Sequence, residues 1–158
     1  MMKKHWLIKS EPGVYSIEDL ARDGSTEWWG VRNYKARNYM RDEMRPGEPI
    51  LFYHSNTDPL GVYGIAEVAS EAHPDSRQFV AGNPYHDPTS DPDDPRWWCV
   101  EVRHVETFGQ PVTRDAMKRA QGLADMKVLA RGMRLSVLPV TPEEFEIVRR
   151  LAASSAAP

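Results

Sequence analysis

The sequence is poor in cysteine and in long apolar runs, and both shortages narrow the class of protein. Cys99 is the only cysteine among the 158 residues, so no disulfide can form within the chain. No apolar run approaches the roughly 20 residues that a membrane-spanning helix needs. The apolar run Trp6, Leu7 and Ile8 is too short for a signal peptide. We therefore expect a cytoplasmic protein that makes no membrane contact.

The spacing that metal ligands usually show is also missing. The five histidines do not pair at helical ligand spacing, and one cysteine cannot build a thiolate site. The acidic stretch from Asp87 to Asp94 lacks the glycine and the terminal glutamate of a calcium loop, so we interpret it as a solvated loop stiffened by prolines. We expect neither a metal nor a cofactor.

Catalytic motifs are absent from the sequence. It contains neither a nucleophile elbow nor a phosphate-binding glycine loop. Ser10, Ser55 and Ser136 are candidate nucleophiles only because they are serines. Cys99 lies in the middle of a predicted strand, a position that favours the core over catalysis. We predict no catalytic residue, and the sequence favours a binding protein over an enzyme.

The chain has no basic excess, because its net charge is −3. The charges are nevertheless uneven. Basic residues outnumber acidic ones between Arg32 and Arg45 and again between Arg114 and Arg134, whereas acidic residues predominate from Pro46 to Thr113. Such asymmetry can give an acidic protein a positive face. Ordinary solvated helix faces are the alternative, since only clustering in space makes a binding surface.

The hydrophobic pattern predicts one α+β domain over residues 1–158. This length is usual for a single domain, and strands and short helices do not alternate regularly, which favours a curved or barrel-like sheet. Residues 152–158 are predicted to be a frayed tail. Strands are expected at His5–Lys9, Pro49–Ser55, Gly61–Ala72, Arg96–Phe108 and Arg134–Val140, and helices at Ser16–Arg22, Asn33–Glu43, Thr113–Gln121, Ala124–Ala130 and Thr141 to about Leu151.

The stretch from Trp28 to Tyr39 interleaves aromatic residues with arginines and asparagines. Aromatic rings stack on bases, asparagine can donate to and accept from a base edge, and arginine holds phosphate. Trp28 follows a polar segment, predicted as a turn from Gly24 to Glu27, and precedes Gly30. We therefore place Trp28 on a pocket wall. The alternative is that Trp28 and Tyr39 are core residues and the arginines are solvated.

Short motifs spread over residues from about Trp6 to Leu151 together form a pattern that is typical of one domain family. They are Trp6–Pro12, Tyr15–Leu20, Trp28, Gly30–Asn38, Leu51–Asn56, Gly64–Val68, Asn83–Tyr85, Asp87–Pro88, Pro95–Trp97, Arg131–Gly132 and Arg134–Val137. In these stretches the chain resembles the EVE-domain family. A departure from the family pattern is Trp29, where relatives usually carry an acid.

The resemblance implies a PUA-like fold, a small mixed β-barrel flanked by short helices, in the superfamily of the YTH domains. YTH domains hold a methylated adenine in an aromatic cage, and EVE-type members are expected to bind modified bases such as methylated cytosines in a corresponding pocket. The implied partner is nucleic acid, and we expect the protein to bind it as a monomer. Extruding a base from a duplex costs a few kcal/mol, so a single-stranded or already flipped base is the expected target.

The aromatic cluster and the resemblance together define a predicted site. The predicted base-binding residues are Ser10, Trp28, Trp29, Asn33, Tyr34, His54, Ser55 and Asn56. The predicted phosphate-binding residues are Lys9, Arg32, Arg37, Arg131 and Arg134.

Two other functions stay open at this point. An enzyme acting on nucleotides or RNA needs a titratable group with a perturbed environment, and His54 is the first candidate. A protein-interaction module needs a flat apolar patch in place of a concave basic pocket.

Overall fold

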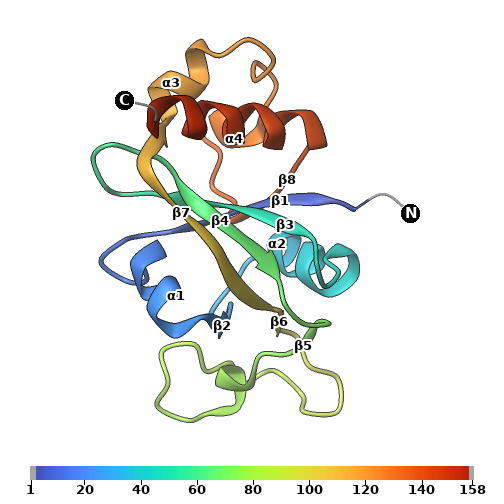
Figure 1. Cartoon of the computed structure of the whole chain (residues 1–158). Coiled ribbons are helices and arrows are strands. Elements are labelled where there is room, and N and C mark those ends of the chain that lie inside the picture. The colour runs from blue at the N-terminus through green and yellow to red at the C-terminus, as the bar shows by residue number, and fades with distance from the viewer. Residues whose placement is uncertain (1–2, 157–158) are drawn as a thin grey trace.

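A mixed sheet forms the centre of the computed structural model, which describes residues 3–156 (Figure 1). β1 (His5–Ser10) pairs in parallel with β3 (Pro49–His54) and antiparallel with β8 (Val137–Val140). β4 (Gly61–Val68) joins β3 to the long β7 (Glu101–Thr113), and β2 (Ser25–Glu27) pairs with the far side of β7. The strand order is β2-β7-β4-β3-β1-β8, so β2 and β8 are the two edges.

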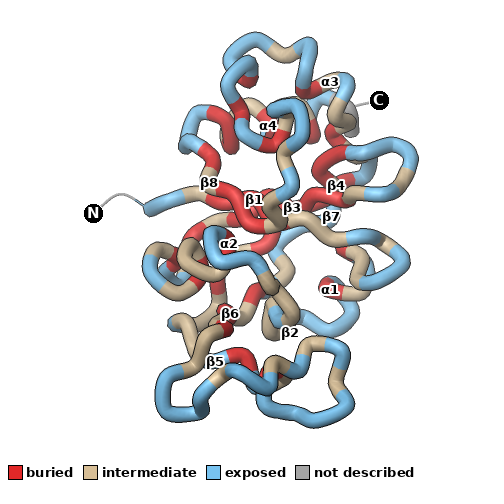
Figure 2. The backbone as a smooth tube through the Cα atoms, turned by 180° about the vertical axis from the view of Figure 1, so that it is seen from behind, coloured by how far each residue is buried: buried red, intermediate tan, exposed pale blue. Residues whose placement is uncertain are grey.

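Both faces of the sheet are buried, because its central strands alternate apolar side chains between two cores. In β1, Trp6 and Ile8 point into one core and Leu7 into the other. β3 repeats this pattern, with Phe52 on the side of Trp6 and Leu51 on the side of Leu7. The buried strands lie at the centre of Figure 2, and the exposed loops surround them.

Short helices cover the two faces of the sheet. α3 (Arg114–Arg119) and α4 (Pro142–Ala156) lie at one end, and β5 (His73–Pro74) and β6 (Trp98–Cys99) lie at the opposite end (Figure 1). α1 (Ile17–Asp23) and α2 (Tyr34–Asn38), which continues as a π-helical turn over Tyr39–Glu43, complete the flanks. Short 3-10 turns occupy Ser76–Phe79 and Lys127–Leu129. In residues 3–156, none of the helices is long and apolar enough to cross a bilayer.

Side-chain caps fix the helix starts that the sequence predicts. The Ser16 hydroxyl accepts from the Asp19 N–H at 3.0 Å, and the Asp19 carboxylate accepts from the Ser16 N–H at 2.9 Å. Thr141 and Glu144 form the same reciprocal pair before α4. Each pair satisfies two helix-end N–H groups that have no partner within the helix. The expected α+β class is confirmed.

Several predicted element boundaries are wrong because tertiary pairing decides them. The segment predicted as a turn at residues 24–27 contains β2, which pairs with residues 101–103 of β7. The strand predicted at Arg96–Phe108 is divided: β6 pairs with β5 in a separate two-stranded sheet, and β7 continues to Thr113. α4 continues past Leu151 to Ala156, and residues 157 and 158 of the expected tail lie outside the described residues.

Gly64 permits the close packing of α1 on the sheet. A Cβ atom at this position would lie 2.8 Å from Cγ1 of Ile17 and would also collide with the Glu106 carbonyl. We expect Gly64→Ala to lower the free energy of unfolding by about 1–3 kcal/mol through overpacking. Gly109→Ala is the matched control, because a Cβ there meets no atom within 4 Å. Urea denaturation of both variants tests this, and equal effects would contradict it.

Candidate functional site

A pocket of about 580 Å³ opens where β1 ends, beside β2 and the segment that links β2 to α2. This volume is in the range of sites for small molecules and cofactors. Residues from four stretches of the chain meet here: residues 9–15, residues 26–32, Tyr85 from the segment between β5 and β6, and Ser136 just before β8. The lining residues are Lys9, Ser10, Glu11, Val14, Tyr15, Thr26, Glu27, Trp28, Trp29, Gly30, Val31, Arg32, Tyr85 and Ser136.

Trp28 forms part of the pocket wall and is half-buried. Its backbone N–H donates to the Val100 carbonyl at 2.8 Å, which fixes the main chain just after β2. The indole meets Phe52 at 5.6 Å and Tyr15 at 6.2 Å between ring centroids, with interplanar angles of 79° and 75°. Because both contacts are nearly perpendicular, neither ring stacks flat on Trp28.

Ser10 and Lys9 supply polar groups at the end of β1. The Ser10 hydroxyl donates to the Tyr15 carbonyl at 2.6 Å, so its lone pairs stay able to accept. The Lys9 ammonium donates to the Met133 carbonyl at 3.2 Å and has further N–H groups to offer. Burial, together with the charge of Arg114, lowers the pKa of Lys9.

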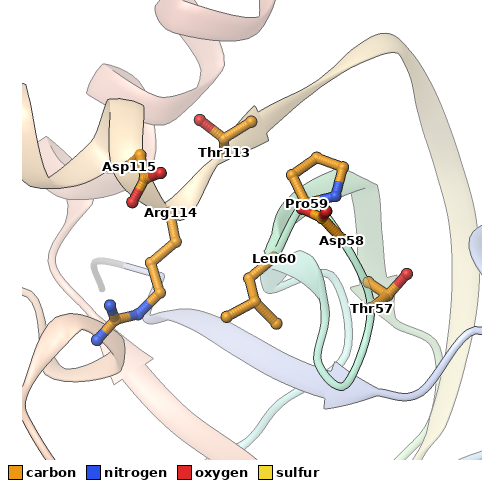
Figure 3. A pocket seen from close by; sticks show the side chains of 7 residues that line it. All are labelled: Thr57, Asp58, Pro59, Leu60, Thr113, Arg114 and Asp115. Atoms are coloured by element: carbon orange, nitrogen blue, oxygen red, sulfur yellow. The ribbon is translucent and has the colours of Figure 1, made fainter.

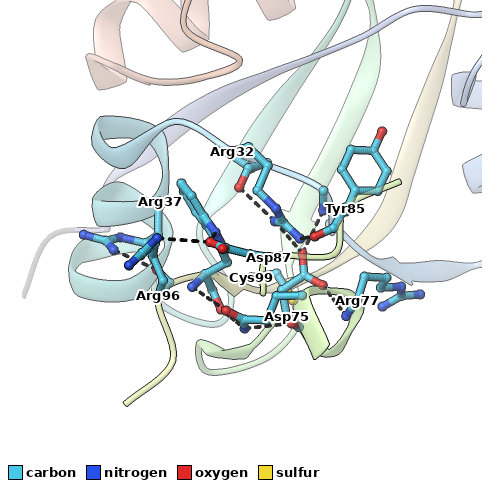
Figure 4. Close-up of polar contacts among 12 residues, drawn as sticks. Arg32, Arg37, Asp75, Arg77, Tyr85, Asp87, Arg96 and Cys99 are labelled. Carbon is cyan, nitrogen blue, oxygen red and sulfur yellow. Dashed lines mark hydrogen bonds and ion pairs between the residues drawn. The ribbon is translucent and has the colours of Figure 1, made fainter. Parts of the chain in front are cut away.

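Asp75 ties the pocket segment to the loop between β5 and β6 (Figure 4). Its side chain is 1% exposed. Oδ2 accepts from the Gly30 N–H at 2.8 Å and from Nη1 of Arg32 at 3.1 Å, and Oδ1 accepts from the Arg77 N–H at 3.0 Å. Arg32 also donates to the Tyr85 carbonyl at 2.8 Å. Arg32 lines the cavity, but its guanidinium is bonded to Asp75 and to the Tyr85 carbonyl and so helps to hold the pocket wall in place.

The loop between β5 and β6 is braced by its own acidic residues. Asp87 accepts from the Thr89 hydroxyl at 2.6 Å, from the Trp97 indole N–H at 2.8 Å and from Arg96 at 3.2 Å. The hydrogen bonds from Thr89 and Trp97 lower the pKa of Asp87 to about 2. This carboxylate is therefore a structural part of a loop that the sequence predicted to be simply solvated.

Three of the predicted site residues lie on α2 or at its start and do not line the pocket. Asn33 caps α2 by accepting from the Ala36 N–H at 3.1 Å. Tyr34 stacks on Trp97 at 5.1 Å with an interplanar angle of 18°. Arg37 donates to the Arg96 carbonyl at 2.7 Å, so its guanidinium is partly engaged.

His54, Ser55 and Asn56 also do not line the pocket, although His54 and Ser55 are bonded to the backbone of the lining residue Ser10. His54 is 1% exposed, and both ring nitrogens are bonded to backbone: Nδ1 to the Ser10 carbonyl at 2.8 Å and Nε2 to the Ile17 N–H at 3.3 Å. A ring that donates from Nδ1 and accepts at Nε2 satisfies both bonds. Asn56 takes a left-handed conformation, with a φ of 53°, in the turn after β3.

A second pocket, of about 270 Å³, lies beside this turn (Figure 3). It contains no aromatic side chain and is smaller than usual ligand sites. Its lining residues are Thr57, Asp58, Pro59, Leu60, Thr113, Arg114 and Asp115. We therefore place the candidate site at the aromatic pocket.

Arg131 and Arg134 are exposed in the loop that precedes β8. The Met133 carbonyl between them accepts from Lys9, and Ser136 lines the aromatic pocket. This loop therefore approaches the pocket from the β8 side. Within residues 3–156, neither arginine takes part in an ion pair.

Sequence reasoning missed several residues that build the pocket. Tyr15 and Tyr85 are in stretches that match the EVE pattern, and that match is the signal that could have found them. Ser136 is likewise in a matching stretch. Glu27 lies in the segment that the sequence predicts as a turn. Asp75 carries no local signal, because its position depends on contacts between distant segments.

The curled mixed sheet, the short flanking helices and the pocket at the end of β1 define a PUA-like domain, as expected. The family model of the EVE domain matches residues 4–151, and the chain belongs to this family. Human thymocyte nuclear protein 1 is 40% identical over 168 residues, which cover 95% of this chain and 74% of that protein.

Solved structures agree with this assignment. A hypothetical protein from Leishmania major superposes with a TM-score of 0.92 at 36% identity, covering 99% of this chain and 98% of the other. The human THYN1 protein, in complex with DNA containing 5-methylcytosine, gives 0.85 at 40% identity, with 95% and 98% covered. The YTH domain of Zygosaccharomyces rouxii MRB1 protein, in complex with N6-methyladenosine RNA, gives 0.54 at 15% identity, with 95% and 86% covered, and shares the fold.

The buried Asp75 carboxylate should dominate the stability of the pocket wall. Asp75→Ala leaves Arg32 and the Gly30 N–H without their partner, so we expect a loss of about 2–4 kcal/mol in the free energy of unfolding. Glu146→Ala is the control, since it removes an exposed ion pair with Arg149 and should cost less than about 0.5 kcal/mol. Thermal and guanidinium unfolding compare the two, and a loss for Asp75→Ala no larger than the control's would refute the assignment.

Proposed function

We propose that this chain is a nucleic-acid-binding protein that takes a modified base into the aromatic pocket. The pocket formed around Trp28 and Tyr15 carries this proposal, because it lies in the fold of a family in which the human THYN1 protein was solved with DNA containing 5-methylcytosine. A methylated cytosine is accordingly the first base to test.

Trp28 is proposed as the stacking platform. Trp28 lines the pocket, and neither of its two aromatic neighbours stacks flat on it, which supports contact between its indole and a flat ligand. Base–aromatic stacking contributes about 1–3 kcal/mol for each base. The Ser10 hydroxyl and the Lys9 ammonium lie at the same pocket and supply an acceptor and a donor for the polar edge of a base.

Arg131 and Arg134 are proposed to hold the phosphates that flank the bound base. Both are exposed beside the loop carbonyl that Lys9 contacts. Arg32 and Arg37, by comparison, donate to protein carbonyls, which favours roles in the framework over roles in phosphate binding. A single-stranded or flipped target fits this arrangement, because the base must leave the stack to enter the pocket.

We also propose that the protein binds without turnover. His54 was the first candidate for a catalytic base, and both of its ring nitrogens are bonded to backbone groups in the interior. A general base must come within hydrogen-bond reach of the proton that it abstracts. A structural role for His54 is therefore favoured.

The role of Trp28 can be tested with two single-stranded DNA oligonucleotides that differ only in one 5-methylcytosine. We expect Trp28→Ala to weaken binding of the methylated strand by about 5- to 150-fold, the loss of one stacking contact. Tyr34→Ala is the matched control, because Tyr34 stacks on Trp97 outside the pocket, and it should retain affinity within about twofold.

Fluorescence anisotropy gives the affinities, and the melting temperature of each variant is measured on the same samples. Loss of binding in a folded Trp28→Ala variant supports the stacking role. A folded variant that binds normally, or one whose loss of binding follows unfolding, would remove Trp28 from the site.

The phosphate contacts can be tested through the salt dependence of binding. Each phosphate contact on a single strand contributes about 0.7 to the slope of log K against log salt concentration. The double variant Arg131→Gln/Arg134→Gln should therefore reduce that slope by about 1.4. Arg149→Gln, at an exposed position of α4, is the control and should leave the slope unchanged. An equal slope in the wild type and the double variant would place the phosphates elsewhere.

A further inference from the structure

Three side chains with metal-ligating atoms meet behind the pocket, at the end of the molecule that carries β5 and β6. Glu27 comes from β2, His73 from β5 and Cys99 from β6. One ligand atom from each lies within 4.8 Å of the other two. Sγ of Cys99 is 3.4 Å from Nε2 of His73, and Nε2 is 3.5 Å from Oε1 of Glu27.

Two of these separations match the distances between ligand atoms in a tetrahedral zinc site. Zinc binds sulfur at about 2.3 Å and nitrogen or oxygen at about 2.0–2.2 Å, so neighbouring ligand atoms in a tetrahedron are roughly 3.3–3.6 Å apart. Two of the three edges already have this length. The third, between Glu27 and Cys99, is no longer than 4.8 Å, and the partly exposed Glu27 side chain can close it by rotating.

The surrounding contacts orient the ligand atoms toward one point. Nδ1 of His73 lies 3.3 Å from the Glu71 carbonyl, which can accept a hydrogen bond from the Nδ1–H group. In that tautomer the lone pair of Nε2 faces the cluster. Arg77 binds Oε2 of Glu27, so Oε1 is the oxygen that faces His73. A thiolate and a carboxylate supply two negative charges toward a divalent cation, and Arg77 offsets one of them.

We propose that Glu27, His73 and Cys99 form a binding site for a divalent metal ion of the zinc class. Sulfur and imidazole ligands select such ions over magnesium and calcium, which prefer oxygen. The metal would join β2 to the two-stranded sheet of β5 and β6, and Glu27 also lines the aromatic pocket. The sequence expectation of no metal rested on spacing along the chain, which does not apply to ligands collected from three strands.

The proposal goes beyond nucleic-acid binding and can be tested without any nucleic acid. The full-length protein is treated with a chelator, dialysed and titrated with Co²⁺, which reports a thiolate ligand through an intense sulfur-to-cobalt charge-transfer band. We expect one equivalent of Co²⁺ to bind, the band to disappear when Zn²⁺ displaces it, and Zn²⁺ to raise the melting temperature of the wild type.

Variants at the three ligands separate this site from surface binding. Cys99→Ser and His73→Ala should abolish the charge-transfer band or weaken Co²⁺ binding by at least about tenfold, and Glu27→Gln should weaken it by a similar factor. His86 is an exposed histidine in the loop between β5 and β6, outside the cluster. The His86→Ala variant should therefore bind Co²⁺ like the wild type. If Cys99→Ser fails to fold, the test rests on His73→Ala, because the His73 side chain is partly exposed and its removal should disturb the fold less.

Three outcomes would overturn the proposal. They are a wild type that shows no charge-transfer band, a band that persists at full affinity in folded His73→Ala, and a loss of the band in His86→Ala. In each case the three side chains would be only a hydrogen-bonded group. The nucleic-acid proposal would be unaffected by any of these results, because its oligonucleotide measurements are independent of metal uptake.

Discussion

The aromatic pocket depends on the hydrogen bonds that the buried Asp75 carboxylate accepts. A carboxylate with 1% exposure needs partners for its oxygens, and it finds them in Gly30, Arg32 and the Arg77 backbone. These bonds join two segments that are far apart in the sequence. One carries Trp28 and Trp29 along the pocket wall, and the other carries Tyr85 to its rim. The pocket shape therefore follows from one desolvated charge and its donors.

Arginine side chains lie over aromatic rings around the site. Arg32 lies 5.5 Å from the ring centroid of Tyr85 and 5.2 Å from that of Trp97. Arg77 lies 4.7 Å from the ring centroid of Trp29 while it pairs with Glu27. Cation–π contacts of this kind are stronger when they are partly desolvated. Arg32 was expected to bind phosphate. Its contacts with these rings show that it also packs against the aromatic side chains around the pocket.

Local signals predicted the fold well where the chemistry is local. The capping pairs Ser16–Asp19 and Thr141–Glu144 marked the starts of two helices, and alternation marked the central strands. Prediction was wrong where the pairing partner decides the structure. The three polar residues of β2 have the composition of a turn, but they form a strand because they pair with β7. For the site, the sequence placed Trp28 and Ser10 at one cavity. It could not separate Asn33, which caps a helix, or His54, which is bonded in the core, from residues that line the pocket.

The division of the interior into two cores by the sheet gives one side chain an unusual position. Leu135 packs against both cores, and it stands between the exposed Arg134 and the pocket residue Ser136. Close-packed interiors transmit strain, because they contain few voids that could absorb a displaced atom. A substitution that changes side-chain volume under α4, on the face of the sheet away from Trp28, can therefore displace Leu135. That displacement would reach the neighbouring pocket residue Ser136. A substitution in that remote core can therefore shift the segment that carries Arg134 and Ser136 while every residue that lines the pocket stays the same.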